Sequence, residues 1–511
     1  MYYSVVKSFV LKLVTISFMV ILFLSVFLPT YEVQMPQHVD SWIVISIADR
    51  IVKDHYIPRV DPFRGATLEY PKGVYAFVAV IHLITGIDMI TLSQLLPAII
   101  FVVMGALNYA IALRLFNKRT VAILSVVFTL LVLTNMTMLG PFYLVPLTFG
   151  ALLILLMLYF ISSGKIFLAI LTYFAIPLTH MNSAMFATLI LGLFFIVNNP
   201  LRYWKYLVLF LVIGITGFLL FLTTKDIILS PEGLLDTLRW GFFVYFKDFF
   251  KLPIERPFIN YLWEIKSIFF FFFGSGLFFI LLREKKARKI LVPSFIFLAI
   301  NLYLFWNYKT GYFLFYRRTI FYLFLLSPLF ISYGVFAIAD VVSSSLLLFT
   351  KNRLTLLIRH THLFLVVLLI ILIPEAVSIN LNAHPSHTWV SKEEHLFFKD
   401  FGKQHPNSYI LTDHLEAYAL PYYDLKPIMT SPMHQGGNFN FDQFFYPYLL
   451  GNGEVIASFF VKNDLYNYVY YPREMQLQNF TAVASQYGLW IYQYQREKND
   501  HNNSEVDEVS N

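Results

Sequence analysis

The sequence predicts an all-α membrane domain that crosses the bilayer about eleven times, followed by a small C-terminal α/β domain. Three observations carry this prediction. Of the 511 residues, 58% are hydrophobic and only 14% are charged, whereas about a quarter of a soluble domain is charged. Apolar runs of about 20 residues recur, each long enough to cross roughly 30 Å of hydrocarbon. The last part of the chain instead contains short strand-like runs separated by polar residues.

Charge also separates these two parts. Residues 384–511 contain eight Lys and Arg against fifteen Asp and Glu, whereas the rest of the chain contains thirty against sixteen. The positive charge lies in short loops between apolar runs, which argues against nucleic acid as a partner. The chain contains no cysteine, which excludes disulfides, thiolate metal sites and cysteine nucleophiles.

The positive-inside rule orders the spans, because Lys and Arg in short loops stay cytoplasmic. The first apolar run lacks a cleavage site and is interpreted as a retained first span. Consecutive basic loops must be separated by an even number of crossings. This places the N-terminus in the cytoplasm and the C-terminal domain outside a plasma membrane, and the short loops indicate a prokaryotic one. The predicted spans are 8–29, 91–113, 119–134, 141–162, 166–179, 182–198, 203–223, 263–282, 290–307, 319–341 and 362–381.

Two further helices are expected in the first external loop, residues 30–90. The apolar run Val74 to Gly86 is too short for a comfortable crossing, and counting it as a span would turn every later basic loop outward. We therefore expect it to lie at the outer surface. Before it, isoleucines repeat at helical spacing over 43–51, which predicts an amphipathic helix. Its solvated face would consist of Asp49, Arg50, Lys53 and Asp54.

The boundaries that follow are 1–383 for the membrane domain, 384–495 for the external α/β domain and 496–511 for an acidic tail. We expect the tail to be disordered because it is polar throughout. Strands alternating with helical stretches indicate the α/β class. The expected strands are 408–413, 426–431, 467–472 and 489–495, with a short helix over 416–423.

Asp40 is the first candidate for chemistry, because it follows the first span and would stand at the bilayer surface. A carboxylate there could act as a general base on a substrate hydroxyl. It could instead cap the amphipathic helix, or be a solvated loop charge. His38, two residues before it, could hold a divalent metal together with Asp40, although a lone His–x–Asp pair is weak evidence.

Two other external polar groups are candidates. Arg317 and Arg318 begin the tenth span on the outer side, against the positive-inside trend, and arginine suits forked binding of phosphate oxygens. Snorkelling to lipid headgroups would explain them equally. His180 lies in the turn between the fifth and sixth spans, where a helix-capping role competes with a functional one.

The chain resembles the GT-C superfamily of integral-membrane glycosyltransferases, which use polyprenyl-phosphate-linked sugars. The resemblance rests on the first loop, with H-V-D-S-W at 38–42, I-P-R-V-D-P-F-R-G at 57–65 and E-Y-P-K-G at 69–73. The turn L-T-H-M-N at 178–182 and the segment F-Y-R-R-T-I-F-Y-L at 315–323 are also similar to parts of that superfamily. So is the tail pattern S-Y-I-L-T-D…L-P-Y-Y from 408 to 423.

The resemblance implies a GT-C-like fold with two juxtamembrane helices after the first span. It implies an inverting transfer at the outer face from a polyprenyl-phosphate sugar to a lipid, glycan or protein acceptor. Asp40 would be the base, and Arg317 and Arg318 would bind the donor phosphate. The residues implied in substrate binding are His38, Asp61, Arg64, Tyr70 and His180.

The sequence also departs from known subfamilies. The W-W-D-Y-G motif of oligosaccharyltransferases is absent, and Ser41 follows Asp40 where protein O-mannosyltransferases have an Asp-Glu pair. No subfamily, and hence no acceptor, is assigned. A transporter or lipid-linked-sugar flippase is the first alternative, but the spans are nearly free of mid-membrane charge, unlike those of transporters. An envelope-polymer ligase or polymerase is the second, and the short 308–318 loop fits it poorly.

Overall fold

The computed structural model describes the protein as two compact units. The first consists of Met1–Glu32, Pro71–Val74 and Gln94–Ser386, and the second of Val33–Tyr70, Tyr75–Ser93 and His387–Asn511. Within these units the described residues are 2–58, 71–132, 140, 142–198, 203–205, 208, 212, 267–308, 314, 316–349, 372–376, 390–412, 419–429, 467–477 and 480–494.

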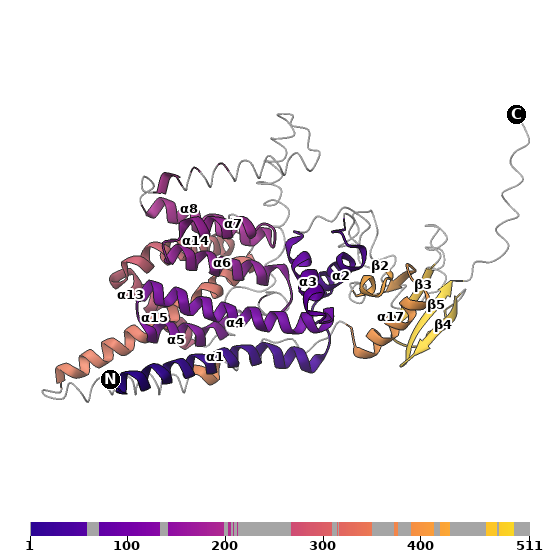
Figure 1. Ribbon diagram of the computed structural model, residues 1–511, viewed down its shortest axis with the longest axis horizontal. Helices are drawn as coiled ribbons and strands as arrows, with labels where there is room; N and C mark the ends of the chain where they lie inside the picture. The colour runs from indigo at the N-terminus through magenta and orange to yellow at the C-terminus, as the bar shows by residue number, and fades with distance from the viewer. Residues whose placement is uncertain are drawn as a thin grey trace, which may run out of the picture. The chain divides into compact units, whose positions relative to one another are not determined.

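The first unit is a bundle of apolar helices (Figure 1). Most of their positions are Leu, Ile, Val and Phe, which bury themselves against neighbouring helices or face lipid. The helices are α1 (Tyr2–Val33), α4 (Met89–Phe116), α5 (Arg119–Phe128), the 3-10 turn η1 (Thr129–Leu131), α6 (Pro146–Ser162), α7 (Ile166–Ala175), α8 (Met181–Val197), α13 (Ser267–Arg283), α14 (Lys285–Tyr308) and α15 (Tyr316–Phe349).

Four described helices are long and apolar enough to cross a membrane, namely segments of α1, α4, α14 and α15. Six further apolar helices of the described residues are shorter. The chain is therefore a membrane protein, as its composition predicts. The count of about eleven spans stays a prediction, since the expected spans 203–223 and 362–381 lie almost entirely outside the described residues.

Helix α15 lies in the centre of the bundle, with 89% of its most apolar stretch buried, against 22% for α1. It crosses α13 in backbone contact at Gly276 and Gly334. A Cβ atom on Gly276 would collide with the Phe330 carbonyl, and one on Gly334 would collide with the Phe272 carbonyl. Small residues that let backbones approach are the usual means of packing helices in membranes.

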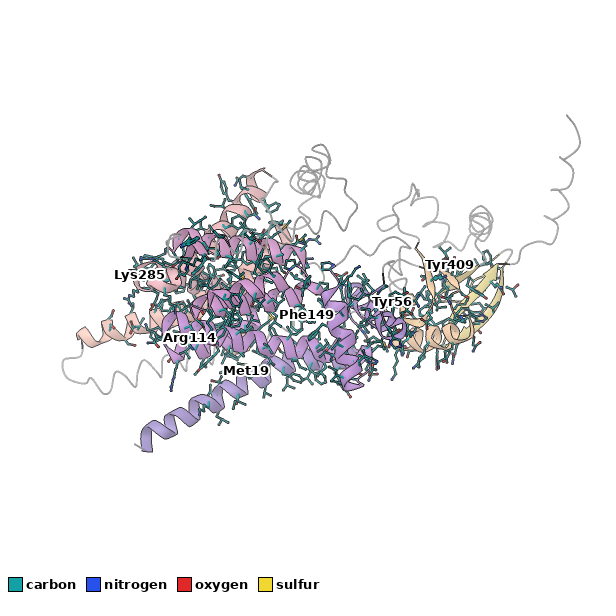
Figure 2. All side chains as sticks on the ribbon, turned by 45° about the horizontal axis from the view of Figure 1, so that its top comes forward. Met19, Tyr56, Arg114, Phe149, Lys285 and Tyr409 are labelled. Carbon is teal, nitrogen blue, oxygen red and sulfur yellow. The ribbon has the colours of Figure 1, made fainter. Side chains whose placement is uncertain are left out.

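Two of the basic loops lie together at one end of the bundle. Figure 2 shows Arg114 and Lys285 at this end. The Lys286 ammonium donates to the Arg114 carbonyl at 2.9 Å, and Lys118 pairs with Glu284 at 3.9 Å. The proximity of these loops agrees with the expected even number of crossings between them. The side of the membrane that they face stays a prediction.

The second unit combines two helices of the first loop with a mixed sheet (Figure 1). The strand order is β2-β1-β3-β5-β4; β1 is parallel to β2 and β3, and β5 is antiparallel to β3 and β4. The elements are α2 (Val39–Asp54), α3 (Gly73–Thr85), α17 (Lys392–Gln404), β1 (Tyr409–Thr412), the 3-10 turn η5 (Leu420–Tyr423), β2 (Lys426–Met429), β3 (Asn467–Tyr471), β4 (Phe480–Gln486) and β5 (Leu489–Tyr494).

The sheet contains the four predicted strands and one that was not predicted, β4. It pairs with β5 across a tight turn at Tyr487 and Gly488, both of which have positive φ, as a type I′ hairpin turn requires. Helix α17 was not predicted either. Of the helix expected over 416–423, the described part is the turn η5; residues 413–418 and the acidic tail lie outside the described residues.

Helix α3 confirms the short helix expected at Val74 to Gly86. Its 13 residues span about 20 Å, which is too short for roughly 30 Å of hydrocarbon. On one of its faces Phe77, Val80 and Ile84 are exposed at the spacing of a helix stripe. Its position at the membrane surface stays a prediction.

Candidate functional site

His180 begins helix α8 and determines the local geometry of the first candidate site. It occupies the N-cap position with extended backbone, and its Nδ1 accepts from the Ser183 backbone N–H at 3.1 Å. Because a backbone N–H can only donate, Nδ1 carries no proton in this arrangement. The neutral ring therefore has its proton on Nε2, which is a hydrogen-bond donor.

Two hydroxyls extend this arrangement into the bundle. The Ser183 hydroxyl lies 2.9 Å from Nδ1 of His180 and 2.9 Å from the hydroxyl of Tyr322 on α15. Ser183 and Tyr322 are both fully buried. With Nδ1 as the terminal acceptor, Ser183 donates to His180 and Tyr322 donates to Ser183. The chain of bonds holds the ring orientation and favours the Nε2–H form.

The electrostatic surroundings keep this imidazole neutral. Burial, and to a smaller extent the positive charge of Arg318, lower the pKa of His180 to about 3. Protonation would place a proton on the nitrogen that caps α8, and would add a second cation beside Arg318. Near neutral pH the group is thus an uncharged N–H donor next to a guanidinium.

Arg317 and Arg318 lie in the first turn of α15, and a buried amide holds that turn. Asn301 of α14 donates to the Thr319 hydroxyl at 2.7 Å and to the Leu314 carbonyl at 3.3 Å. Asn301 and Thr319 are buried, so these bonds fix the helix start that carries both arginines. The charge of Arg318 is near enough to His180 to lower the pKa of its imidazole, so two of the residues that the sequence singled out act on each other electrostatically.

Two glycines allow the His180 turn to pack closely. A Cβ atom on Gly150 of α6 would collide with the Ser183 side chain. The backbone N–H of Gly73, at the start of α3, donates to the Leu178 carbonyl at 2.8 Å, and a Cβ there would collide with that same carbonyl. Either substitution would displace the turn that presents the imidazole.

The second candidate site is the start of α2. The N-cap is His38, whose Nδ1 accepts from the Asp40 backbone N–H at 3.0 Å. The suggestion that Asp40 caps this helix is therefore wrong. His38 supplies the acceptor at the N-cap position, and Asp40 lies two residues later, in the first turn of the helix. Its carboxylate is 39% exposed and lies 4.0 Å from Nδ1 of His38. A negative charge in this turn is favoured by the helix dipole.

His38 and Asp40 would supply two ligands for a metal at the start of α2. Nowhere in the described part of the chain do three His, Asp or Glu side chains gather as metal ligands. Nδ1 of His38 already accepts a hydrogen bond from the Asp40 backbone N–H, so a metal would have to bind His38 through Nε2.

The other predicted substrate-binding residues are not placed. Asp61, Arg64 and Tyr70 lie outside the described residues. His38 and Asp40 belong to the second unit, while His180, Arg317 and Arg318 belong to the first.

No family model and no curated sequence matches the chain. Solved structures do. An oligosaccharyltransferase from Archaeoglobus fulgidus, tethered with an acceptor peptide containing the NVT sequon, superposes with a TM-score of 0.59 at 13% identity. The match covers 91% of this chain and 69% of that one.

Two further solved structures match over nearly the whole chain. ArnT from Cupriavidus metallidurans, bound to undecaprenyl phosphate, gives a TM-score of 0.53 at 14% identity over 94% of this chain and 97% of that one. The arabinofuranosyltransferase AftD from mycobacteria gives 0.53 at 12% identity over 96% of this chain, although only 40% of AftD is covered. All three are glycosyltransferases of the GT-C type. The chain has the GT-C fold.

This confirms the resemblance drawn from the first loop and the F-Y-R-R segment, at the level of fold. Sequence reasoning missed Ser183 and Tyr322, the partners of His180 in the GT-C bundle. Ser183 carried a usable signal, because a hydroxyl three residues after a cap can bond back to it. Tyr322 carried none, since 139 residues separate it from Ser183.

Proposed function

We propose that the protein is a membrane glycosyltransferase that moves a sugar from a polyprenyl-phosphate-linked donor to an acceptor at the extracytoplasmic face. The observation that carries the proposal is the end-to-end match with ArnT, a structure bound to undecaprenyl phosphate. The acceptor class, whether lipid, glycan or protein, and the sugar are left open.

The donor phosphate would be bound by the first unit. Arg317 and Arg318 supply guanidinium groups suited to phosphate oxygens, and His180 adds a neutral Nε2–H donor next to Arg318. As the bond from the anomeric carbon to the phosphate oxygen breaks, its electron pair passes to the phosphate. Fixed positive charge and N–H donors stabilise that developing charge.

Asp40 would act on the acceptor. Its exposed carboxylate takes the proton of the acceptor hydroxyl while that oxygen bonds to the anomeric carbon. The transition state resembles an oxocarbenium ion, as in glycoside hydrolysis. Attack on the face opposite the leaving phosphate inverts the anomeric configuration. Asp61, Arg64, Tyr70 and His38 are proposed to bind the sugar or the acceptor.

The test is to incubate the purified protein in lipid vesicles with radiolabelled polyprenyl-phosphate sugars and candidate acceptors, and to identify the products. We expect a covalently glycosylated product and free polyprenyl phosphate in equal amounts. A flippase would instead move the labelled lipid between leaflets without releasing phosphate lipid. Translocation without any glycosylated product, for every donor and acceptor class tried, would contradict the proposal.

A further inference from the structure

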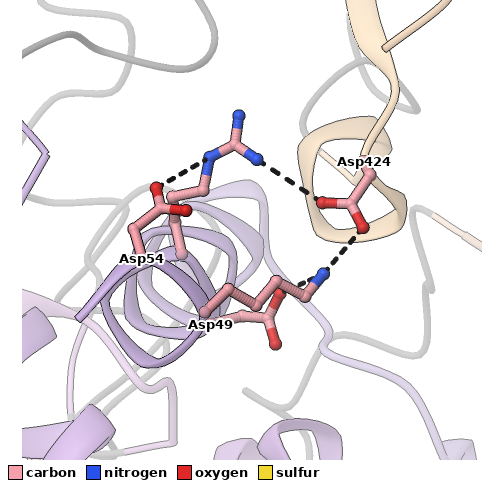
Figure 3. Close-up of polar contacts among 5 residues, drawn as sticks. Asp49, Asp54 and Asp424 are labelled. Atoms are coloured by element: carbon pink, nitrogen blue, oxygen red, sulfur yellow. Dashed lines mark hydrogen bonds and ion pairs between the residues drawn. The ribbon is translucent and has the colours of Figure 1, made fainter. Parts of the chain in front are cut away.

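The charged face of α2 was expected to be solvated, and the structure shows that it binds the C-terminal part of the chain instead. Asp424, which follows turn η5, accepts from the Lys53 ammonium at 2.9 Å and from the Arg50 guanidinium at 3.5 Å (Figure 3). These three residues, Arg50, Lys53 and Asp424, are called the clamp below. All of them belong to the second unit.

The backbone fixes the position of Asp424. It caps turn η5 in the left-handed conformation, with φ of 59°, a region that Asp and Asn tolerate better than most residues. Its carbonyl accepts from the Asn407 backbone N–H at 2.7 Å, and strand β2 begins two residues later. The position of the carboxylate is therefore fixed relative to strand β2 and hence to the sheet.

Each cation of the clamp also has a carboxylate partner on its own helix. Lys53 pairs with Asp49 at 2.9 Å and Arg50 with Asp54 at 3.6 Å, each four residues apart. Burial alone would lower the pKa of Lys53, but its bonds to Asp424 and Asp49 outweigh burial and raise the pKa. Helix α2 would thus keep its internal ion pairs if Asp424 were neutralised, so the clamp joins α2 to the sheet without being needed to form α2.

Trp42 secures the other end of the helix. It is fully buried, and its ring lies 5.9 Å from that of Tyr422 and 6.2 Å from that of Tyr423, both in turn η5. Trp42 and Lys53 are eleven residues apart, about 16 Å along a helix. Contacts at both ends of α2 fix its rotation about its axis as well as its place on the sheet.

We propose that the C-terminal sheet, through the clamp and Trp42, holds α2 in the orientation that aims the Asp40 carboxylate, so that Asp424 is a positioning residue for transfer. Asp40 is two residues before Trp42 on the same rigid helix, and its direction follows the rotation of that helix. The proposal rests on the proposed function, which gives Asp40 its role. Misplacing a reacting group by about 1 Å can lower a rate by about a hundredfold.

The first test is Asp424→Asn, which suits the left-handed backbone and removes only the charge. Backbone hydrogen exchange over α2 should rise about fivefold, and kcat for transfer should fall about tenfold while KM for the lipid-linked donor stays within twofold. The matched control is Asp400→Asn, which removes an exposed ion pair with Lys403 on α17 and should change neither. Unchanged kcat in Asp424→Asn would overturn the proposal, whether or not α2 exchange rises.

A crosslink separates positioning from charge. The chain has no cysteine, so Lys53→Cys with Asp424→Cys can be joined by a short thiol-reactive crosslinker that a reductant cleaves. We expect low kcat before crosslinking, recovery to at least half of the wild-type kcat after it, and loss again on reduction. Crosslinking in high yield without recovery would show that the joint does not position Asp40.

The two proposals fail separately. If the wild-type protein transfers no sugar at all, the proposed function is wrong, and with it the role of Asp424 in transfer. Hydrogen exchange over α2 would still report whether the clamp holds the helix. If the wild-type protein transfers sugar and Asp424→Asn equals it in kcat, only the positioning proposal is wrong.

Discussion

The starts of α2 and α8 use the same local arrangement for different chemistry. Each begins with a histidine whose Nδ1 accepts a backbone N–H, at 3.0 Å for His38 and 3.1 Å for His180. The surroundings differ. The carboxylate of Asp40 follows His38 within the first helical turn, whereas hydroxyls and the charge of Arg318 accompany His180. The histidine cap fixes the geometry of each helix start. The neighbouring side chains decide whether that start presents a carboxylate, as at Asp40, or a neutral N–H donor, as at His180.

The largest effect is expected at Asp40. If this carboxylate is the base, Asp40→Asn should lower kcat by about 10²–10⁴-fold while leaving folding intact. Glu393→Gln is the matched control, because Glu393 occupies the same first-turn position in α17 and its loss removes a similar helix-dipole contribution. Initial rates of sugar transfer measure both variants. Equal, small losses in the two would show that Asp40 contributes only to the helix start.

His180 should show an intermediate effect and distinguish cap from donor. His180→Ala removes both roles and should lower the free energy of unfolding by about 1 kcal/mol, and transfer about tenfold. His180→Asn keeps a good cap but loses the Nε2–H, so stability should recover while transfer stays low. Thermal unfolding in detergent and transfer rates are compared for both. Recovery of transfer in His180→Asn would reduce this residue to a cap.

Acid should affect the same group in a predictable direction. The pKa of His180 in the folded protein, about 3, lies below the ordinary value of about 6.5. Between these values the unfolded chain binds the extra proton, so stability should fall as pH drops from about 6.5 to about 3. His180→Asn should show a shallower fall than the wild type over this window, measured as the midpoint of thermal unfolding. Parallel profiles would contradict an imidazole that the folded protein holds neutral.

The smallest effect is expected at His38. Asparagine also accepts from the backbone at an N-cap, so His38→Asn should preserve α2 and keep transfer within about threefold of the wild type. His38→Ala should lower the free energy of unfolding by about 1 kcal/mol. A loss in His38→Asn as large as that in Asp40→Asn would instead show that the ring takes part in the transfer step or holds a metal, beyond its proposed contact with the sugar or the acceptor.

The sequence predicts the fold where local pattern decides it. Helix α2 follows from isoleucines at helical spacing, and α3 from an apolar run too short to cross. Four strands follow from runs rich in Tyr, Val and Ile. Strand β4 was missed because F-T-A-V-A-S-Q contains small and polar residues that pair only through β5. Helix α17 could have been found, since Ser391 and Glu394 form a capping box.

The sites were predictable only in part. His180, Arg317 and Arg318 stand out because polar groups interrupt an apolar sequence. The residues that hold them in place do not stand out, because Tyr322 bonds to Ser183 and Asn301 bonds to Thr319 only through helix packing. Asp424 was overlooked for a similar reason: its partners Arg50 and Lys53 are more than 370 residues away. Charges at helical spacing suggest a solvated face, and only the fold shows that Asp424, in the same compact unit, pairs with it.

We propose two separate roles: the start of α15 binds the donor phosphate, and Asp40 takes the proton of the acceptor hydroxyl. Equilibrium binding of a polyprenyl phosphate to three proteins in vesicles tests this proposal most directly: the wild type, Asp40→Asn, and the double charge reversal Arg317→Glu with Arg318→Glu. We predict that Asp40→Asn binds within about twofold of the wild type. The double variant should bind at least about tenfold more weakly, as expected from lost charge-assisted bonds. Unchanged binding by the double variant, or loss of binding in Asp40→Asn, would contradict the account.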